Sequence, residues 1–307
     1  MSTSSDIPYF QDYFPETGAC TNNSEPEPEP EPDPDEAFVE LANASVVGFR
    51  ISGSKRKKEV RVRQDSACQT HTGGIVWETA YLLAGYLKCK SNGVKSLGKV
   101  LEVGSGCGML GIILAASRMA KQVVMTETTE VIPNLEENLA LNMKSKKEED
   151  QDHNYTYACC TPDKISVRQL RWDEFEKDIL ECQADKSSDL DPHSFDTIIG
   201  TDVIFSTSLV KPLLKTLREM SHAGTHIYLC VQIRCADSHA LLLKKASKYG
   251  LAVEDCTDDL NEIPELKWGL AMDCIILHLS VTKEERVDNK RKRETKTGKK
   301  SKKSSKK

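Results

Sequence analysis

The stretch from residue 100 to residue 111, VLEVGSGCGMLG, constrains the fold of this chain more than any other segment. A mostly apolar run is followed by three glycines at alternate positions, and an apolar pattern with helical spacing begins at Met109. This order predicts a buried strand, a tight turn and a helix. Glycine tolerates positive φ and lets the backbone approach a ligand closely, so a small molecule is expected to bind at Gly104, Gly106 and Gly108. A turn that only reverses the chain is the alternative.

Strand-like and helix-like segments alternate along the 307-residue chain. After the glycine stretch, strand patterns are expected at residues 122–127, 165–172, 195–205, 226–232, 251–255 and 272–279. Helical patterns separate these strands except for the last two. Alternation predicts a parallel sheet with right-handed crossovers, and the last pair predicts one antiparallel strand. The fold class is therefore α/β, a Rossmann-like seven-stranded mostly parallel sheet with helices on both faces and an antiparallel last strand. A β-hairpin outside this sheet is expected from Val46–Ile51 and Glu59–Arg63.

Composition divides the chain into three parts. Residues 1–36 contain an acidic, proline-rich stretch that offers little to bury, and they are expected to be disordered. Residues 288–307 consist mainly of Lys, Arg, Ser and Thr and are expected to form a second disordered segment. The remaining residues, 37–287, have the right length for one α/β domain that carries the N-terminal hairpin. The formal net charge of −5 hides this separation of an acidic head from a basic tail.

Composition also excludes several classes of protein. No uninterrupted apolar run approaches the ~20 residues that cross a bilayer, and the polar N-terminus lacks a signal-peptide core. The 11 cysteines include no Cys-x-x-Cys pair, which argues against a zinc module and a disulfide framework. Free thiols suit a reducing compartment. We therefore expect a protein of the cytoplasm, and of the nucleus if the basic tail is an import signal, with no membrane partner and no metal.

Two glutamates flank the glycine turn and narrow the choice of ligand. Glu127 ends the second strand, 23 residues after Gly104, where a carboxylate in such folds accepts hydrogen bonds from a ribose. Glu102 precedes the first glycine by two residues, and its charge would disfavour a pyrophosphate but suit a ligand that carries an ammonium and a sulfonium. S-adenosylmethionine fits these charges better than NAD does. The alternatives are that Glu102 is only a partly exposed strand residue, and that the protein is a nicotinamide-dependent oxidoreductase.

Five short motifs follow one another along the chain: GGIVW at 73–77, LEVGSGCG at 101–108, TE at 126–127 with Asn138 and Asn142, LRW at 170–172, and DVIF at 202–205. In this order and spacing, over roughly residues 46–279, the chain resembles the seven-β-strand protein-lysine methyltransferases of family 16. The family signature after the fourth strand is an acidic residue, two others, and Tyr or Phe. DVIF satisfies it with the less common Phe. Within the family, residues 212–217 look most like the branch that acts on valosin-containing protein, a chaperone-like ATPase.

The resemblance implies a cofactor, S-adenosylmethionine, and residues that hold it. Gly104, Ser105 and Gly106 would approach the cofactor on the side where Glu102 is expected, and Glu127 would bind its ribose. These five residues belong to the ends of the first two strands of the predicted sheet. The cofactor is therefore expected at the edge of the sheet where parallel strands end.

The resemblance also implies the residues of the methyl-acceptor side. Trp77 and Trp172 would line the cofactor pocket, while Asp202 would contact the cofactor and, with Phe205, shape the entrance for the acceptor. Phe205 lacks the hydroxyl of the Tyr form, so a mechanism that needs this hydroxyl is in doubt. Arg171 stands where many members carry Asp, which leaves the contacts near the adenine edge open.

The expected reaction transfers a methyl group to the side-chain amine of a lysine in a protein substrate. Lysine has an ordinary pKa of about 10.4, so the site must accept or release a proton before the amine attacks. Desolvation in an aromatic-walled channel lowers the pKa of an amine. Asp202 and Phe205 are the expected catalytic residues, with Asp202 orienting the amine by hydrogen bonding rather than acting first as a base.

The sequence leaves the partners open. A chaperone-like ATPase, a chaperone or an elongation factor is the expected kind of substrate. Methylation of histidine or arginine and a non-catalytic binding module are the alternatives. The Lys-rich tail allows a nuclear import signal, a weak contact to RNA or ribosomes, or a purely solubilising segment. The protein is expected to be a monomer.

Overall fold

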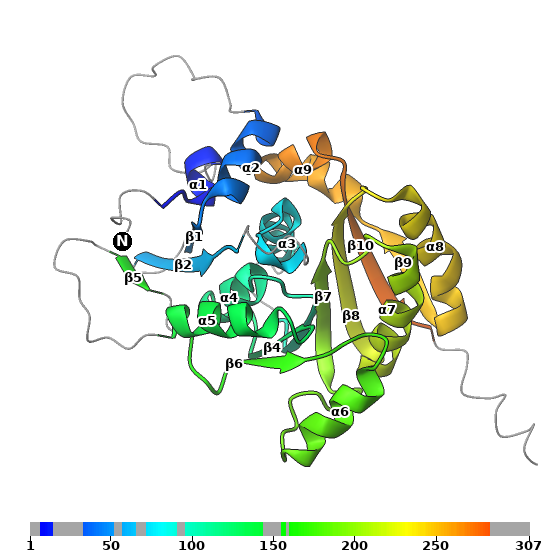
Figure 1. Ribbon diagram of the computed structural model, residues 1–307. Helices are drawn as coiled ribbons and strands as arrows, with labels where there is room; N and C mark the ends of the chain where they lie inside the picture. The colour runs from blue at the N-terminus through cyan, green and yellow to red at the C-terminus, as the bar shows by residue number, and fades with distance from the viewer. Residues whose placement is uncertain are drawn as a thin grey trace, which may run out of the picture.

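The computed structural model of the protein describes residues 7–14, 33–51, 57–65, 72–90, 96–143, 155–157 and 160–282. Figure 1 shows a large sheet with helices on both sides and a small sheet beside it. The disorder expected for residues 288–307, and for the acidic stretch within residues 15–32, concerns segments outside the described residues. In the described ranges, no helix is both long and apolar enough to cross a membrane.

The large sheet has seven strands, which are β3 (Lys99–Val103), β4 (Gln122–Glu127), β6 (Ile165–Gln169), β7 (Phe195–Thr201), β8 (Ser221–Gln232), β9 (Leu251–Asp255) and β10 (Cys274–Val281). Their order is β6-β4-β3-β7-β8-β10-β9. The pairs from β6 to β8 are parallel, whereas β10 runs antiparallel to both of its neighbours. The predicted mostly parallel sheet with an antiparallel last strand is confirmed.

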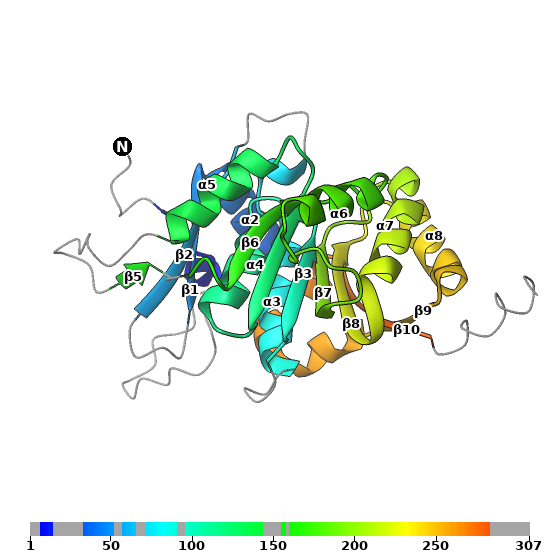
Figure 2. The same ribbon diagram turned by 90° about the horizontal axis from the view of Figure 1, so that it is seen from below.

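Two helical layers enclose this sheet, as Figures 1 and 2 show. One layer holds α3 (Glu78–Lys90), α4 (Met109–Ala116) and α5 (Ile132–Asn142), and the other holds α6 (Phe175–Ala184), α7 (Thr207–Met220) and α8 (Ala236–Ala246). Successive side chains of a strand point to opposite faces of the sheet, so they pack alternately against the two helical layers. Val100 packs against the first layer and Leu101 against the second. Short 3₁₀ turns complete the domain at η2 (Thr72–Gly74), η3 (Ser247–Tyr249), η4 (Thr257–Glu262) and η5 (Pro264–Leu266).

The small sheet contains β1 (Val46–Ile51), β2 (Lys57–Arg63) and β5 (Tyr155–Tyr157). The strands β1 and β2 pair antiparallel, which confirms the predicted hairpin. The strand β5 was not expected, and it pairs parallel to the first three residues of β2. Strands brought together from distant parts of the chain therefore build this sheet.

Two asparagines of α5 continue the hydrogen-bond ladder along the free part of β2. Asn138 accepts from the backbone N–H of Arg63 (2.7 Å) and donates to its carbonyl oxygen (3.0 Å). Asn142 makes the same pair of bonds with Arg61, at 3.1 Å and 2.7 Å. Each amide thus acts like a strand neighbour, and the hairpin is fastened to the helical layer next to the glycine turn.

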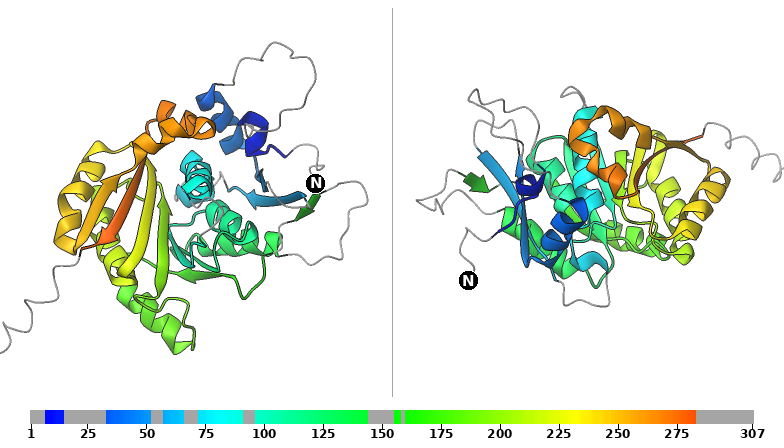
Figure 3. Two further views of the ribbon diagram at one scale, coloured as in Figure 1. Left: turned by 180° about the vertical axis from the view of Figure 1, so that it is seen from behind. Right: turned by 90° about the horizontal axis from the view of Figure 1, so that it is seen from above.

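The N-terminal boundary of the domain differs from the prediction. A helix within residues 1–36, α1 (Phe10–Tyr13), packs against the domain, and α2 (Pro34–Asn43) begins before residue 37. The ring of Phe10 is stacked on that of Tyr81 in α3, with 4.5 Å between centroids. Figure 3 shows α1 and α2 beside α9 (Trp268–Ala271), near the C-terminal part of the domain. Apolar residues that precede the acidic stretch are therefore part of the core.

Two strands end earlier than predicted at the edge of the sheet that carries the glycine turn. The strand β6 stops short of residue 172 because the N–H of Arg171 donates to the carboxylate of Asp178 in α6 (2.6 Å) instead of to a strand. The strand β7 stops short of residue 205 because Asp202 adopts a φ of +52°, which no strand residue has. Both departures turn side chains toward one cavity.

Candidate active site

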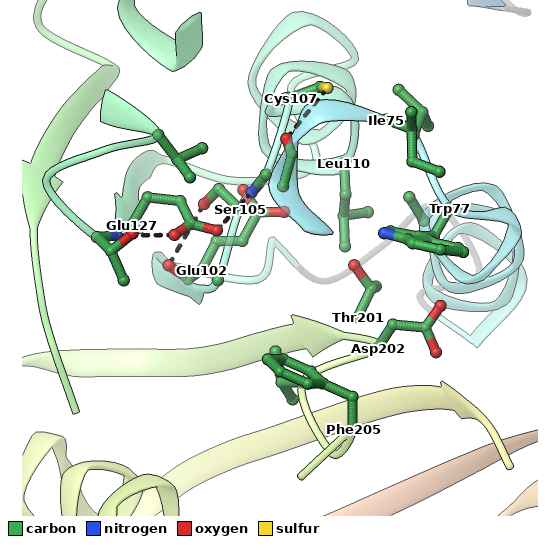
Figure 4. A pocket seen from close by; sticks show the side chains of 18 of the residues that line it. Ile75, Trp77, Glu102, Ser105, Cys107, Leu110, Glu127, Thr201, Asp202 and Phe205 are labelled. Carbon is green, nitrogen blue, oxygen red and sulfur yellow. Dashed lines mark hydrogen bonds between the residues drawn. The ribbon is translucent and has the colours of Figure 1, made fainter. Parts of the chain in front are cut away.

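A cavity of about 540 Å³ lies at the carboxyl ends of the parallel strands β3, β4, β6 and β7. Parallel strands bring their carboxyl ends to one edge, which is where ligands bind in open α/β sheets. Figure 4 shows the interior of this cavity. All nine residues predicted for the site line it: Trp77, Glu102, Gly104, Ser105, Gly106, Glu127, Trp172, Asp202 and Phe205.

Two glycines of the turn between β3 and α4 have no substitute. Gly104 has a φ of +67°, and a Cβ atom there would lie 3.0 Å from Val203 and 3.4 Å from the ring of Trp172. Gly108, the N-cap of α4, has a φ of +83°, and a Cβ atom there would lie 2.5 Å from Leu135. Gly104 therefore presents bare backbone to the cavity, as expected of a close approach to a ligand. Gly108 does not line the cavity, so the expectation of a ligand contact there is wrong; packing against Leu135 requires glycine at this position instead.

Ser105 ties the glycine turn to the neighbouring strand. Its backbone N–H donates to the carbonyl oxygen of Thr126 (3.0 Å), and its hydroxyl accepts from the N–H of Thr126 (3.1 Å). The hydroxyl of Thr126 donates in turn to the carbonyl oxygen of Glu102 (2.7 Å). These bonds set the distance between the strands that carry the two glutamates. A direct contact of Ser105 with a cofactor stays a prediction.

Glu127 is the last residue of β4, and its carboxylate faces the glycine turn (Figure 4). The carboxylate accepts hydrogen bonds from the backbone N–H groups of Gly106 (3.1 Å) and Thr128 (2.7 Å). Two backbone donors thus fix the orientation of the carboxylate at the cavity wall. The carboxylate of Glu127, which is predicted to bind the ribose of the cofactor, is therefore oriented before a cofactor binds.

Glu102 is only 1% exposed although it lines the cavity. Among the described residues, none forms a hydrogen bond with its Oε2 atom, which lies under the first turns of α4. Burial raises the pKa of this carboxyl to about 8 and the charge of Glu127 adds to the shift, while hydrogen bonding to Ser105 and to the backbone of Gly111 opposes it in part. A buried carboxyl without a full set of partners would be stabilised in its charged form by a cationic ligand. The interpretation of Glu102 as a partly exposed strand residue is wrong.

The two tryptophans come from segments that flank the sheet edge. Trp77 immediately precedes α3, and the guanidinium carbon of Arg234 lies 4.3 Å from its ring centroid. Trp172 follows β6, its ring faces Gly104, and its carbonyl oxygen accepts the hydroxyl of Thr216 in α7 (3.3 Å). Both indoles are half-buried. Both rings line the cavity, Trp172 beside Gly104 and Trp77 beside Arg234.

Asp202 follows β7 and is held by four hydrogen bonds. Its backbone N–H donates to the carbonyl oxygen of Cys230 (2.9 Å). Its Oδ1 atom accepts the N–H of Gln232 (2.9 Å), and its Oδ2 atom accepts the hydroxyl of Thr79 (3.1 Å) and a guanidinium N–H of Arg234 (2.8 Å). A carboxylate engaged in this way is a positioned hydrogen-bond acceptor.

Phe205 and Arg171 differ in how they relate to the cavity. Phe205 is 47% exposed, so its ring stands at the entrance, as expected. Arg171 also lines the cavity, but its guanidinium is bound to Asp178 and Glu174 of the α6 region. These ion pairs anchor the loop that carries Trp172. The departure from the family pattern at Arg171 thus has a structural role in this chain.

Three polar residues that surround Asp202 were missed from the sequence: Glu78, Thr79 and Arg234. The first two follow a recognised motif at residues 73–77 directly, and their position at the start of a helix was a usable signal. Arg234 lies two residues beyond the end of β8 and belongs to no motif. The only signal for Arg234 in the sequence was the general rule that ligands bind where parallel strands end. In the described ranges, no group of three or more His, Cys, Asp or Glu side chains is arranged to hold a metal ion.

Comparison with known proteins identifies relatives over the same region. The chain is 24% identical to the protein-lysine methyltransferase METTL21E of Bos taurus over 222 residues, which are 71% of this chain and 63% of that protein. It is 22% identical to the EEF1A lysine methyltransferase 3 of Xenopus tropicalis over 176 residues, 57% of this chain and 65% of that protein. The chain therefore spans less than two thirds of the length of these relatives. A solved structure, the methyltransferase domain of bacterial CtHen1-C, has a TM-score of 0.45 at 13% identity, covering 67% of this chain and 100% of that chain.

The sequence profile described as lysine methyltransferase matches residues 54–248, which is more than half of the chain. The matched region contains the glycine turn, both glutamates of the cavity and the DVIF motif. The resemblance first seen in five short motifs is thus confirmed over a continuous region. The chain belongs to the lysine methyltransferase family.

Proposed function

We propose that this protein is an S-adenosylmethionine-dependent methyltransferase that transfers methyl groups to the side-chain amine of a lysine in a protein substrate. One observation carries the proposal: a buried carboxyl with an unpartnered oxygen, Glu102, lines the same cavity as Glu127 and Asp202. Two acidic groups near the glycine turn suit a cationic adenosine cofactor, and a third suits an amine. Membership of the lysine methyltransferase family supports the same reaction.

The acidic groups and the glycine backbone that line the cavity suit S-adenosylmethionine. Glu102 would face the ammonium or the sulfonium, and Glu127 would accept hydrogen bonds from the ribose hydroxyls. The bare backbone at Gly104 and the ring of Trp172 would lie against the cofactor. A cation next to Glu102 would lower the pKa of its carboxyl from about 8, so that binding releases a proton. When bound, S-adenosylmethionine supplies a methyl group that a neutral amine can displace directly.

The acceptor side is formed by Trp77, Asp202 and Phe205. A lysine ammonium has no lone pair and must lose a proton before it attacks. Desolvation between the two aromatic rings favours the neutral amine. An ionised carboxylate offers about four acceptor positions, and three bonds to the Asp202 side chain occupy Oδ2 fully and Oδ1 in part. We therefore assign Asp202 the role of orienting the amine through Oδ1, while the proton leaves to water.

The substrate and the compartment belong to the same proposal. One relative is named as a lysine methyltransferase of EEF1A, which supports a protein as the acceptor, and an elongation factor is one class to test. A chaperone-like ATPase is the further class that the motif at residues 212–217 suggests, and another chaperone is a class to test beside it. We propose a cytoplasmic protein that also enters the nucleus through its Lys-rich tail, and removal of residues 288–307 tests this import.

Incubation of the purified protein with labelled S-adenosylmethionine and cell extract, followed by mass spectrometry of the labelled proteins, tests the proposed activity. We expect label on lysine in one or a few proteins. Glu127→Gln should abolish labelling, whereas Glu137→Gln, on the exposed face of α5, should not change it. Label on histidine or arginine would show that the methyl acceptor is that side chain and not lysine. Binding of S-adenosylmethionine without any labelling would instead support a non-catalytic binding module.

A further inference from the structure

Arg234 lies two residues beyond the end of β8, at the sheet edge that carries Asp202. Its side chain is 38% exposed and lines the cavity. The guanidinium carbon lies 4.3 Å from the ring centroid of Trp77. Arg234 is thus placed between an aromatic wall of the cavity and the carboxylate assigned to the acceptor amine.

Two different carboxylates hold the two ends of this guanidinium. Nη1 donates to Oδ2 of Asp202 (2.8 Å), and Nη2 donates to Oε1 of Glu78 (2.5 Å). The side chains of Asp202 and Glu78 are only 9% and 8% exposed, so neither carboxylate can turn to solvent. A planar fork that bridges two carboxylates and stacks on an indole has one orientation, which a lysine ammonium cannot reproduce.

The charge of Arg234 bears on the protonation of an incoming lysine. A carboxylate without a cation beside it favours the ammonium over the amine, because opposite charges stabilise the charged form. The ammonium cannot attack, since its nitrogen has no lone pair. The guanidinium of Arg234 offsets part of the negative charge of Asp202 and Glu78, so an amine that approaches Asp202 meets a less negative site than it would without Arg234.

The other titratable groups around the pair do not supply this positive charge. Burial raises the pKa of Glu78 above its ordinary value. Burial also raises the pKa of the thiols of Cys230 in β8 and Cys274 in β10, so both stay neutral near pH 7. Further acidic groups lie before β10 or along the rest of the cavity: Asp273, Glu102, Glu127, Glu130 and Asp173. Among the described cavity residues, the other cation is Arg171, which is bound to Asp178 and Glu174.

We infer that Arg234 is a positioning residue of the acceptor site, which holds Asp202 and Trp77 in place and partly offsets the Asp202 charge, so that lysine reacts as a neutral amine. This inference rests on the proposed function. In the step that Arg234 assists, the amine forms a bond to the methyl carbon while the methyl–sulfur bond breaks. The proton that the ammonium has lost goes to water.

Three substitutions separate the charge of Arg234 from its packing. Arg234→Met keeps an apolar side chain against Trp77 but removes the charge, and Arg234→Gln is a second neutral variant in case the first is unfolded. Arg234→Lys keeps the charge but cannot bridge both carboxylates. The unfolding temperature of each variant reports whether it is folded. The rate of methyl transfer is then measured from about pH 6.5 to about pH 9.5. Labelled S-adenosylmethionine and dialysed cell extract are both supplied at saturating concentrations.

The acid limb is the low-pH side of the profile, where the saturated rate falls as pH decreases. We expect the neutral variants to shift this limb to higher pH by about one unit. The rate near pH 7 then falls about tenfold, and alkaline pH restores it. Arg234→Lys should keep the wild-type limb at a lower rate throughout. A neutral variant that keeps the wild-type limb, whatever its rate, overturns the role of Arg234 and leaves the proposed function intact. Failure of the wild type to label any protein overturns both.

Discussion

At the scale of single residues, Glu102 and Glu127 carry carboxyl groups of one cavity in two different electrostatic situations. Glu127 accepts two backbone N–H groups. Glu102 is buried without a partner for Oε2, and burial raises its pKa to about 8. In the ligand-free protein, Glu102 is therefore mostly protonated at neutral pH, and it is poised to become charged when a cation binds.

The stability of the ligand-free protein is expected to fall as pH rises from about 4.5 to about 8. The pKa of Glu102 is about 8 in the folded state and 4.5 ordinarily, so the folded state binds more protons in this window. The free energy of unfolding then decreases with pH and levels off above the folded pKa. Glu102→Gln should remove this dependence and gain roughly 2–4 kcal/mol at pH 8, with little difference at pH 4.5. Urea unfolding at both pH values measures it, and a gain that does not vary with pH would contradict the assignment.

Asp202→Ala is expected to abolish methyl transfer while S-adenosylmethionine binding is largely retained. The carboxylate orients the amine in our proposal, and loss of orientation lowers the rate by about a hundredfold or more. Labelling assays measure the transfer, and calorimetric titration measures the binding. Asp185→Ala, at the exposed end of α6, serves as a matched control. Full activity of Asp202→Ala would contradict the proposal that Asp202 orients the acceptor amine.

At the scale of elements, α5 connects the small sheet to the glycine turn. Asn138 holds β2 at Arg63 and also donates to the carbonyl oxygen of Cys107 in the turn (3.1 Å). Asn142 holds β2 at Arg61 and makes no hydrogen bond to the turn among the described contacts. Two similar side chains, one helical turn apart, therefore differ in their link to the cavity.

Replacement of either asparagine by alanine should destabilise the protein by roughly 2–4 kcal/mol, because buried backbone groups of β2 lose their partners. Only Asn138→Ala should also weaken S-adenosylmethionine binding, since only Asn138 supports the turn. Urea unfolding and calorimetric titration of both variants check this difference. Equal effects of the two substitutions on binding would show that the hydrogen bond from Asn138 to Cys107 does not stabilise the turn for cofactor binding.

At the scale of the whole molecule, the N-terminal residues close the core of the first helical layer. Phe10 is 7% exposed and contacts an aromatic group that includes Phe14, Phe38, Phe49, Tyr81 and Trp268. These rings come from the N-terminus, the hairpin, α3 and α9. The folded domain thus joins segments from its two ends.

Phe10→Ala is expected to lower the free energy of unfolding by roughly 3–5 kcal/mol, the usual loss for a buried phenylalanine. Val39→Ala on α2, where the side chain is 61% exposed, should change stability by less than about 0.5 kcal/mol. Thermal and urea unfolding measure both variants. If Phe10→Ala were as stable as the control, the packing of α1 would not contribute to the core.

Much of the fold and of the site was predictable because it is written in short patterns. The alternation of strands and helices led to the seven-stranded sheet, and the unseparated last pair led to the antiparallel strand. Motifs at the strand ends led to eight residues of one cavity, because parallel strands deliver their carboxyl ends to one edge, and the motif before α3 added Trp77. Arg234 escaped prediction, since a single arginine after a strand carries no pattern of its own.

Local order along the chain was sufficient for the fold class, the family and the residues that meet at the cavity, because periodicity and turn chemistry act between near neighbours. Contacts between distant residues set the remainder. They bury Glu102 and raise its pKa, bind Arg234 to Asp202 and Glu78, and draw Phe10 into the core. Burial and electrostatic pairing depend on which groups come together in space, and neighbours in sequence do not carry that information.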